Sequence, residues 1–245
     1  MKNIGIISLY GLIFGMIGTT LGGLIGAFLN IKSNRFLSFI LELAAGLMTA
    51  IICFDLIPEG LEIINISLCI LGIIFGIISM IFCSKLVSIY CQNNSTLESN
   101  HMLKTGLIIA IGLAVHNFPE GLAIGAGFDV SDVLGFKLAI AIAIHDIPEG
   151  VSISLPLKNS GSNKLKSILI ATLSGLTTGI GAFLGSIIGN ISPILIGLSL
   201  GFAAGAMLYI VSCELIPESK KLYKGRFASI GNIIGLLLGL LSQNI

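Results

Sequence analysis

The chain has 245 residues, of which 55% are hydrophobic and only 10% are charged, and its mean hydropathy is +1.04. A soluble domain has about 25% charged residues, so this composition excludes a soluble globular protein and indicates one that meets lipid. The net charge of +1 gives no indication of nucleic-acid binding, and we expect no nucleic-acid partner. The five cysteines are scattered without a Cys-x-x-Cys spacing, which favours packing over disulfides or zinc thiolates.

Long apolar segments make up most of the sequence. A helix of roughly 20 apolar residues crosses the hydrocarbon core of a bilayer. The first segment begins like a signal peptide, but it continues without a cleavage site until it is long enough to span. Eight helical spans are predicted by this criterion, at residues 4–29, 36–58, 63–84, 103–128, 132–157, 166–190, 193–218 and 227–243. The sequence therefore predicts an all-α integral membrane protein, with one transmembrane domain over residues 1–245 and one long loop at about 85–102.

Lysine and arginine are distributed unequally between the two sides of this predicted bundle. Of the 13 basic residues, all except Lys2 and Lys137 lie in or beside the first, third, fifth and seventh loops. Loops rich in basic residues remain in the cytoplasm. We therefore expect a multi-pass protein of the cell (plasma) membrane, with the long loop inside and both termini outside.

Glycine recurs at every fourth residue along one face of several spans. Small residues at this spacing let transmembrane backbones approach closely, so these faces are expected to pack the bundle. The glycines concerned are Gly18, Gly22, Gly26, Gly181, Gly185, Gly189, Gly197, Gly201, Gly205, Gly231, Gly235 and Gly239.

One short motif occurs four times, as DLIPEG at 55–60, HNFPEG at 116–121, HDIPEG at 145–150 and ELIPES at 214–219. Each copy has a possible metal ligand at position i, a proline at i+3 and a glutamate at i+4. On an α-helix, positions i and i+4 are about 40° apart, so both side chains leave the same face. The proline also deprives the carbonyl four residues earlier of its helical donor. A charge, a bend and a free carbonyl are tolerated inside a membrane only on a face that looks into the protein.

The two central copies lie near the middle of adjacent antiparallel spans. Three carboxylates, those of Glu120, Asp146 and Glu149, are expected near one another, and no lysine or arginine lies at that depth. Their mutual repulsion calls for a divalent ion or bound protons. Imidazole together with carboxylate suits zinc, iron, manganese or cobalt better than magnesium or calcium. The plainer alternative is a structural hydrogen-bonding role for one of the two histidines, His116 or His145.

The two outer copies lie near span ends, one toward each side of the membrane. They predict an entrance and an exit for a cation path, although charges near span ends cost little and could simply be interfacial. The entrance acids are Asp55 and Glu59, and the exit acids are Glu214 and Glu218. No role is predicted for Glu42 or His101.

With these motifs, the chain resembles the ZIP (Zrt/Irt-like) family of divalent metal transporters, bacterial type. The resemblance rests on eight spans with both termini outside, HNFPEG in the fourth span and HDIPEG in the fifth. It implies a 3+2+3 bundle, in which the first and last three helices are inverted repeats around a central pair. It also implies a homodimer, because the family usually dimerises.

The resemblance implies two adjacent metal sites. The first consists of His116, Glu120, His145 and Glu149, and the second of Asn117 and Asp146, with Glu149 shared. Many relatives have a glutamate in the sixth span that completes the second site, but here SGLTTGIGA at 174–182 places Thr178 at that position. The cytoplasmic loop also lacks the histidine cluster that is frequent in the family.

We therefore expect a carrier that moves zinc, or alternatively iron, manganese, cobalt or cadmium, into the cytoplasm by alternating access. The metal is its substrate, and we expect neither a catalytic cofactor nor an enzymatic activity. One alternative is a selective divalent-cation channel that uses the same ligands. Another is an intramembrane metalloprotease, but such an enzyme needs two histidines four residues apart with a glutamate base, which neither HNFPE nor HDIPE supplies.

Overall fold

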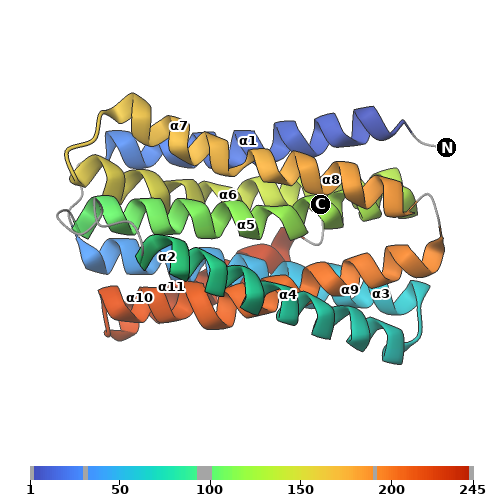
Figure 1. Cartoon of the computed structure of the whole chain (residues 1–245). Helices are drawn as coiled ribbons and strands as arrows, with labels where there is room; N and C mark the ends of the chain where they lie inside the picture. Colours follow the sequence, from blue (N-terminus) through green and yellow to red (C-terminus); the bar gives the residue numbers. More distant parts are fainter. Residues whose placement is uncertain (1–2, 30–32, 93–100, 190–191, 243–245) are drawn as a thin grey trace.

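The structure is a computed structural model that describes residues 3–29, 33–92, 101–189 and 192–242 (Figure 1). Every regular element in these ranges is helical, which confirms the predicted all-α class. The elements are α1 (Ile4–Phe28), α2 (Asn34–Ile51), η1 (Ile52–Leu56), α3 (Ile57–Ile63), α4 (Ile66–Gln92), α5 (His101–Val130), α6 (Asp132–Asn159), α7 (Lys164–Ser174), α8 (Leu176–Gly189), α9 (Pro193–Ile210), η3 (Val211–Leu215), α10 (Ile216–Leu222) and α11 (Arg226–Ser242).

The predicted spans all coincide with helices. Within the described residues, seven continuous helical segments are long and apolar enough to cross a membrane, and the apolar helix Arg226–Leu241 is slightly shorter. The predicted loop 85–102 needs correction, because α4 continues to Gln92 and α5 already begins at His101. Residues 85–92 contain no glycine or proline, so nothing in the backbone stops the helix where its apolar stretch ends. The rest of that loop lies outside the described residues.

Short polar residues begin several helices at the predicted membrane boundaries. The Ser33 hydroxyl accepts a hydrogen bond from the Phe36 amide, and the Ser131 hydroxyl accepts one from Leu134. Ser192 caps α9 in the same way and is followed by a proline at the first helical position. Such caps satisfy amides that have no partner inside the helix.

The helices pack as two groups, which Figure 1 shows as an upper and a lower layer. The first group contains α1, α5, α6, α7 and α8; the second contains α2, η1, α3, α4, α9, η3, α10 and α11. In the first group α1 packs most extensively on α6, and α5 on α8. In the second group α2 packs on α11, and α4 on α9. Exchanging the first three spans with the last three, and α5 with α6, reproduces each pairing, as an inverted repeat requires.

Two positions illustrate how closely the helices approach within the first group. A Cβ atom at Gly22 of α1 would lie 2.8 Å from the Cα of Gly150 on α6. A Cβ atom at Gly181 of α8 would lie 2.8 Å from the backbone nitrogen of Leu122 on α5. Real Cβ atoms do not come this close to backbone, so the predicted packing role of the glycine faces is confirmed at these contacts.

The two outer copies of the repeated motif contain a turn of π-helix that the sequence did not predict. The π-turn η1 carries Asp55 as its fourth residue, and η3 carries Glu214 in the same place. A proline follows each turn at the second position, and its missing N–H favours a local change of helical register. By contrast, the helix at Pro119 and Pro148 remains α-helical throughout.

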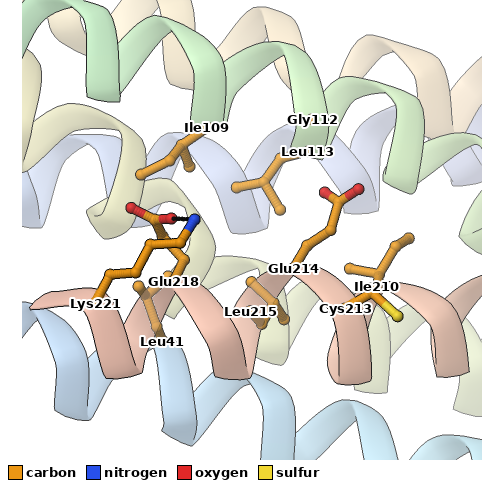
Figure 2. Close-up of a pocket in the computed structure, with 10 residues that line it drawn as sticks. All are labelled: Leu41, Ile109, Gly112, Leu113, Ile210, Cys213, Glu214, Leu215, Glu218 and Lys221. Carbon is orange, nitrogen blue, oxygen red and sulfur yellow. Dashed lines mark hydrogen bonds and ion pairs between the residues drawn. The ribbon is translucent and has the colours of Figure 1, made fainter. Parts of the chain in front are cut away.

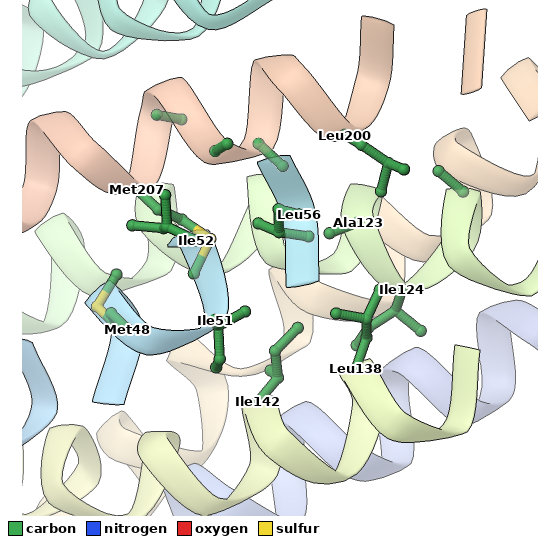
Figure 3. Close-up of a cluster of buried hydrophobic side chains, with 14 of the residues drawn as sticks. Met48, Ile51, Ile52, Leu56, Ala123, Ile124, Leu138, Ile142, Leu200 and Met207 are labelled. Atoms are coloured by element: carbon green, nitrogen blue, oxygen red, sulfur yellow. The ribbon is translucent and has the colours of Figure 1, made fainter. Parts of the chain in front are cut away.

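A continuous apolar core joins the two groups (Figure 3). Ile52 and Leu56 of η1 belong to one buried cluster with Ala123 and Ile124 of α5 and Leu138 of α6. The spans differ greatly in how much of their surface the fold covers. In α6, 72% of the most apolar stretch is buried, against 22% in the span Ile66–Leu86.

Candidate metal centre

The centre is formed where α5 and α6 pack side by side within the first group. This packing brings the two central motif copies together, because each motif lies near the middle of its helix. Four possible ligands meet there, with one ligand atom of each lying within 4.8 Å of all the others: Glu120, His145, Asp146 and Glu149. All four residues are completely buried.

The imidazole of His145 lies between two of the carboxylates. Its Nε2 is 2.5 Å from Oε1 of Glu120 and 3.5 Å from Oδ1 of Asp146. The structure therefore brings Asp146, predicted for the second site, to the histidine predicted for the first. Members of both expected ligand sets therefore lie in one cluster.

A break in the sixth span positions Asn117 beside this cluster. The predicted helix 166–190 is divided at Gly175 into α7 and α8, and the carbonyl of Ser174 at the break accepts a hydrogen bond of 3.0 Å from Nδ2 of Asn117. Gly175 itself faces α1, where a Cβ atom would lie 2.6 Å from the carbonyl oxygen of Gly15. A hydrogen bond therefore fixes the amide group of Asn117 within the interior.

Several buried oxygens near these residues have no hydrogen-bond partner in the described part of the chain. They are Oδ1 of Asn117, both carboxylate oxygens of Asp146 and the hydroxyl of Thr178. Buried polar atoms are rarely left unsatisfied in proteins, and each such case calls for an explanation such as an ion or a water molecule. Together with three carboxylates and an imidazole, these oxygens form a donor set that suits a divalent transition metal.

His116, the remaining predicted ligand, belongs to α5 one turn before Glu120. Its side chain lies outside what the structure describes, so its part in the centre stays a prediction. The same holds for His101, whose backbone is the first residue of α5.

The predicted entrance acids lie on η1 and α3. Asp55 is buried and forms an ion pair of 3.1 Å with Lys137 of α6. Glu59, one turn further along, is half-buried. The sequence does not predict this ion pair, because the position of Lys137 indicates only that it lies toward the outer side of the membrane.

The predicted exit acids line a cavity toward the other end of the bundle (Figure 2). The cavity has a volume of about 310 Å³ and lies between α5, η3, α10 and α2. Figure 2 shows the carboxylates of Glu214 and Glu218 projecting toward α5. Glu214 accepts a hydrogen bond from Ser84 of α4, and Glu218 pairs with Lys221 at 3.0 Å.

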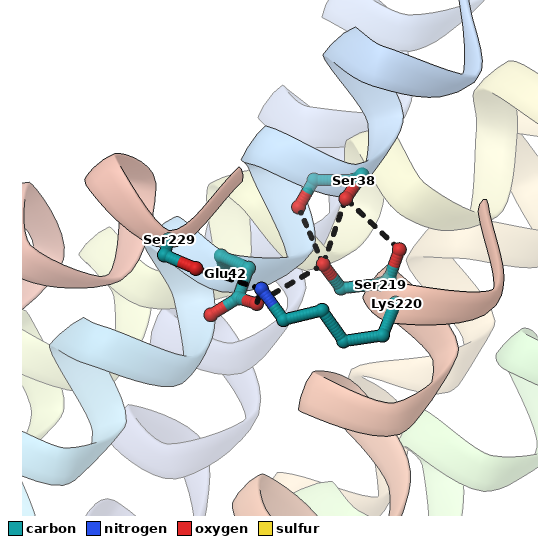
Figure 4. Close-up of polar contacts among 5 residues, drawn as sticks. All are labelled: Ser38, Glu42, Ser219, Lys220 and Ser229. Carbon is teal, nitrogen blue, oxygen red and sulfur yellow. Dashed lines mark hydrogen bonds and ion pairs between the residues drawn. The ribbon is translucent and has the colours of Figure 1, made fainter. Parts of the chain in front are cut away.

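A second polar cluster, which the sequence reasoning did not find, joins α2 to α10 and α11 (Figure 4). The carboxylate of Glu42 is buried and lies 2.8 Å from Nζ of Lys220, which also donates to the hydroxyl of Ser229. The hydroxyls of Ser38 and Ser219 lie 2.8 Å apart in the same cluster. The available signal was the spacing of Ser38 and Glu42, which are four residues apart and thus on one face of α2.

An eight-span bundle built from inverted repeats, with buried carboxylates and an imidazole gathered inside it, defines a membrane protein that handles cations. The sequence model of one family, described as ZIP zinc transporter, matches residues 96–242. The chain belongs to this family.

The similar proteins agree with this assignment. The zinc transporter ZupT of Chlorobium chlorochromatii (strain CaD3) is 30% identical over 92% of this chain and 92% of its own length. ZupT of Shigella flexneri serotype 5b (strain 8401) is 32% identical over 86% of this chain and 88% of its own length. The zinc transporter GufA of Myxococcus xanthus is 38% identical, but the match covers 56% of this chain and only 54% of that protein.

Proposed function

We propose that this protein transports divalent transition-metal ions, zinc foremost, across the cell membrane into the cytoplasm. The observation that supports this most directly is the buried cluster of Glu120, His145, Asp146 and Glu149, whose ligand atoms lie within 4.8 Å of one another. Three carboxylates gathered in the interior repel one another unless a cation or bound protons offset their charge. The relatives named above are zinc transporters, which favours zinc as the ion.

The transported ion binds at the level of this cluster. His116, Glu120, His145 and Glu149 supply the main ligands, and Asn117 and Asp146 supply further oxygens. Thr178 adds a neutral hydroxyl to the same region. The protein acts on the ion by binding and releasing it, so no covalent chemistry and no catalytic cofactor is required.

Alternating access explains why the two ends of the bundle differ. On the outer side, Leu56, Ala123 and Leu138 belong to a tightly packed apolar core, and Asp55 is paired. On the inner side, Glu214 and Glu218 line a cavity of about 310 Å³. This asymmetry supports a carrier whose present conformation faces the cytoplasm, with Asp55 and Glu59 at the closed entrance and Glu214 and Glu218 at the exit. Inverted repeats supply the second conformation by exchanging roles.

The decisive experiment is uptake of zinc by proteoliposomes that contain the purified protein. Replacement of Glu149 by glutamine preserves its shape and removes its charge. Uptake should fall by roughly tenfold or more, because even residues outside the ligand shell change metal affinity by about that factor. The matched control is Glu62→Gln at the exposed end of α3, which should transport normally. Normal uptake by Glu149→Gln would mean that the ion crosses elsewhere.

The alternative is a divalent-cation channel with the same ligands, and the dependence of the uptake rate on zinc concentration distinguishes it from a carrier. A carrier saturates at a low turnover because each ion requires a conformational change, and such changes take microseconds or longer. Single-channel currents in a planar bilayer would favour the channel.

A further inference from the structure

The ion pair between Asp55 and Lys137 connects the two packing groups of the molecule. Asp55 lies on η1 in the second group, and Lys137 lies in the second turn of α6 in the first group. Their charged atoms are 3.1 Å apart, and the side chain of Asp55 is only 3% exposed, against 29% for Lys137. The ion pair therefore joins a buried carboxylate to a lysine side chain that is partly exposed at the surface.

This pair lies at the outer edge of the apolar core that covers the metal centre. Lys137 precedes His145 by eight residues on α6, which places it about 12 Å further toward the outer end. Its neighbour Leu138 and Asp55's neighbour Leu56 both belong to the core shown in Figure 3. Any movement that opened a path from outside to the centre would have to separate these two leucines and the charged pair beside them.

We propose that Lys137 is the latch of the outer entrance: its ammonium group holds Asp55 while the entrance is closed, and an arriving divalent ion releases it by binding the same carboxylate. The proposal rests on the transport function proposed above. It makes Lys137 a positioning residue, because it acts through Asp55 and does not touch the ion.

The strength of the pair suits repeated opening. Partly exposed ion pairs contribute little to stability, since water and salt screen them and long side chains lose freedom. A divalent ion brings twice the charge of an ammonium group to the same carboxylate, so it can compete with lysine for that carboxylate. Asp55 therefore has a positive partner both while the entrance is closed and when the ion arrives.

The ion pair of Glu42 and Lys220 provides a natural control. It is similar in length, at 2.8 Å, and its carboxylate is equally buried, but both partners belong to the second group. Relative movement of the two groups does not break it. Its removal should leave the entrance as it is.

The first test measures access from outside in a variant without native cysteines, with a single reporter at Ala123→Cys. Ala123 is completely buried in the outer part of the core, so a membrane-impermeant maleimide reaches it only when the entrance opens. In metal-free buffer, Lys137→Gln and Asp55→Asn should each raise the labelling rate, by roughly two- to fivefold for an ion pair of this kind. The double variant Asp55→Asn with Lys137→Gln should not label faster than either single variant. Lys220→Gln should label at the parent rate.

The charge-exchanged variant Asp55→Lys with Lys137→Asp sharpens this test, because it restores the ion pair and should return labelling toward the parent rate. Labelling of Lys137→Gln at the parent rate would overturn the proposal, and so would an equal increase in Lys220→Gln. The labelling requires no transport, so it can succeed even where the Glu149→Gln experiment disproves the proposed metal path.

The second test is made on protein that keeps its native cysteines. It measures the rate of zinc uptake as a function of the external zinc concentration. Lys137→Gln should lower KM by roughly two- to fivefold, because zinc no longer competes with lysine for Asp55. In an Asp55→Asn background the same substitution should leave KM unchanged. A general packing defect would affect both backgrounds alike, so an equal shift in the two would contradict the latch.

Discussion

Thr178 takes the position in the candidate metal centre at which the family resemblance implies a glutamate in many relatives. It is completely buried on α8, and its hydroxyl has no hydrogen-bond partner among the described residues. A glutamate at this position, as the resemblance implies, would add a carboxylate to the region of Asn117 and Asp146. Two unit positive charges about 4 Å apart repel by about 4 kcal/mol even at an effective dielectric constant of about 20, and two divalent ions repel about four times as strongly, so each missing negative charge matters.

We therefore predict that the purified protein binds one zinc ion tightly per protomer, and that Thr178→Glu adds a second. Elemental analysis and calorimetric titration give the number of zinc ions bound per protomer in the parent and in Thr178→Glu. Thr178→Gln is the matched control, since it has the same size without the charge, and it should bind like the parent. Two tight ions in the unmodified protein would disprove this explanation.

The sequence predicted which side chains gather at the candidate centre better than it predicted their surroundings. Glu120, His145 and Glu149 could be placed together because motif spacing fixes which face of a helix they share and hydropathy fixes their depth. The ion pair of Asp55 with Lys137 could not be found in this way, because it depends on how the second and fifth spans meet. The cluster around Glu42 escaped for the same reason.

At the scale of the helices, the four copies of one motif do not adopt one conformation. The outer copies begin within the π-turns η1 and η3, whereas the central copies lie in unbroken α-helix. All four have proline at the same place, so local sequence does not separate the two outcomes. What differs is the packing, because α5 and α6 lie together in the first group, whereas the outer copies belong to helices that pack in the second. Sequence could predict the spans but not these turns or the break at Gly175.

The contact of α5 with α8 yields a prediction for stability. Gly121→Ala places a methyl group against the backbone of α8, where the nearest atoms belong to Thr178 and Ala182. Overpacking of this kind costs about 1–3 kcal/mol, so the detergent-solubilised variant should unfold at a lower temperature. Gly112→Ala is the control on the same helix, because its methyl group would meet only a carboxylate oxygen of Glu214 at 3.6 Å. Equal melting temperatures for the two variants would contradict the close approach.

At the scale of the whole molecule, the antiparallel order of the spans fixes every loop once one loop is assigned to a side. The helix ends near Lys164, Lys166 and Arg226 gather at the same end of the bundle as the cavity of the exit acids. The distribution of basic residues predicts that this end faces the cytoplasm. The homodimer implied by the resemblance stays a prediction.

The orientation can be tested with single cysteines in a chain without native ones. In intact cells, an impermeant maleimide should label Ile245→Cys and should miss Ser160→Cys until the membrane is permeabilised. The reason is that a loop with several lysines is retained on the cytoplasmic side. Labelling of Ser160→Cys alone in intact cells would reverse the orientation, and with it the assignment of entrance and exit.

The unequal burial of the spans has a consequence for how this sequence can vary. In the span Ile66–Leu86, whose most apolar stretch is only 22% buried, a side chain needs to be apolar but has few neighbours to fit. In α6, where that share is 72%, volume and shape are constrained as well. Random exchanges among leucine, isoleucine, valine and phenylalanine should therefore be accepted at most positions of α4 and rejected at most positions of α6, although the two helices are both hydrophobic.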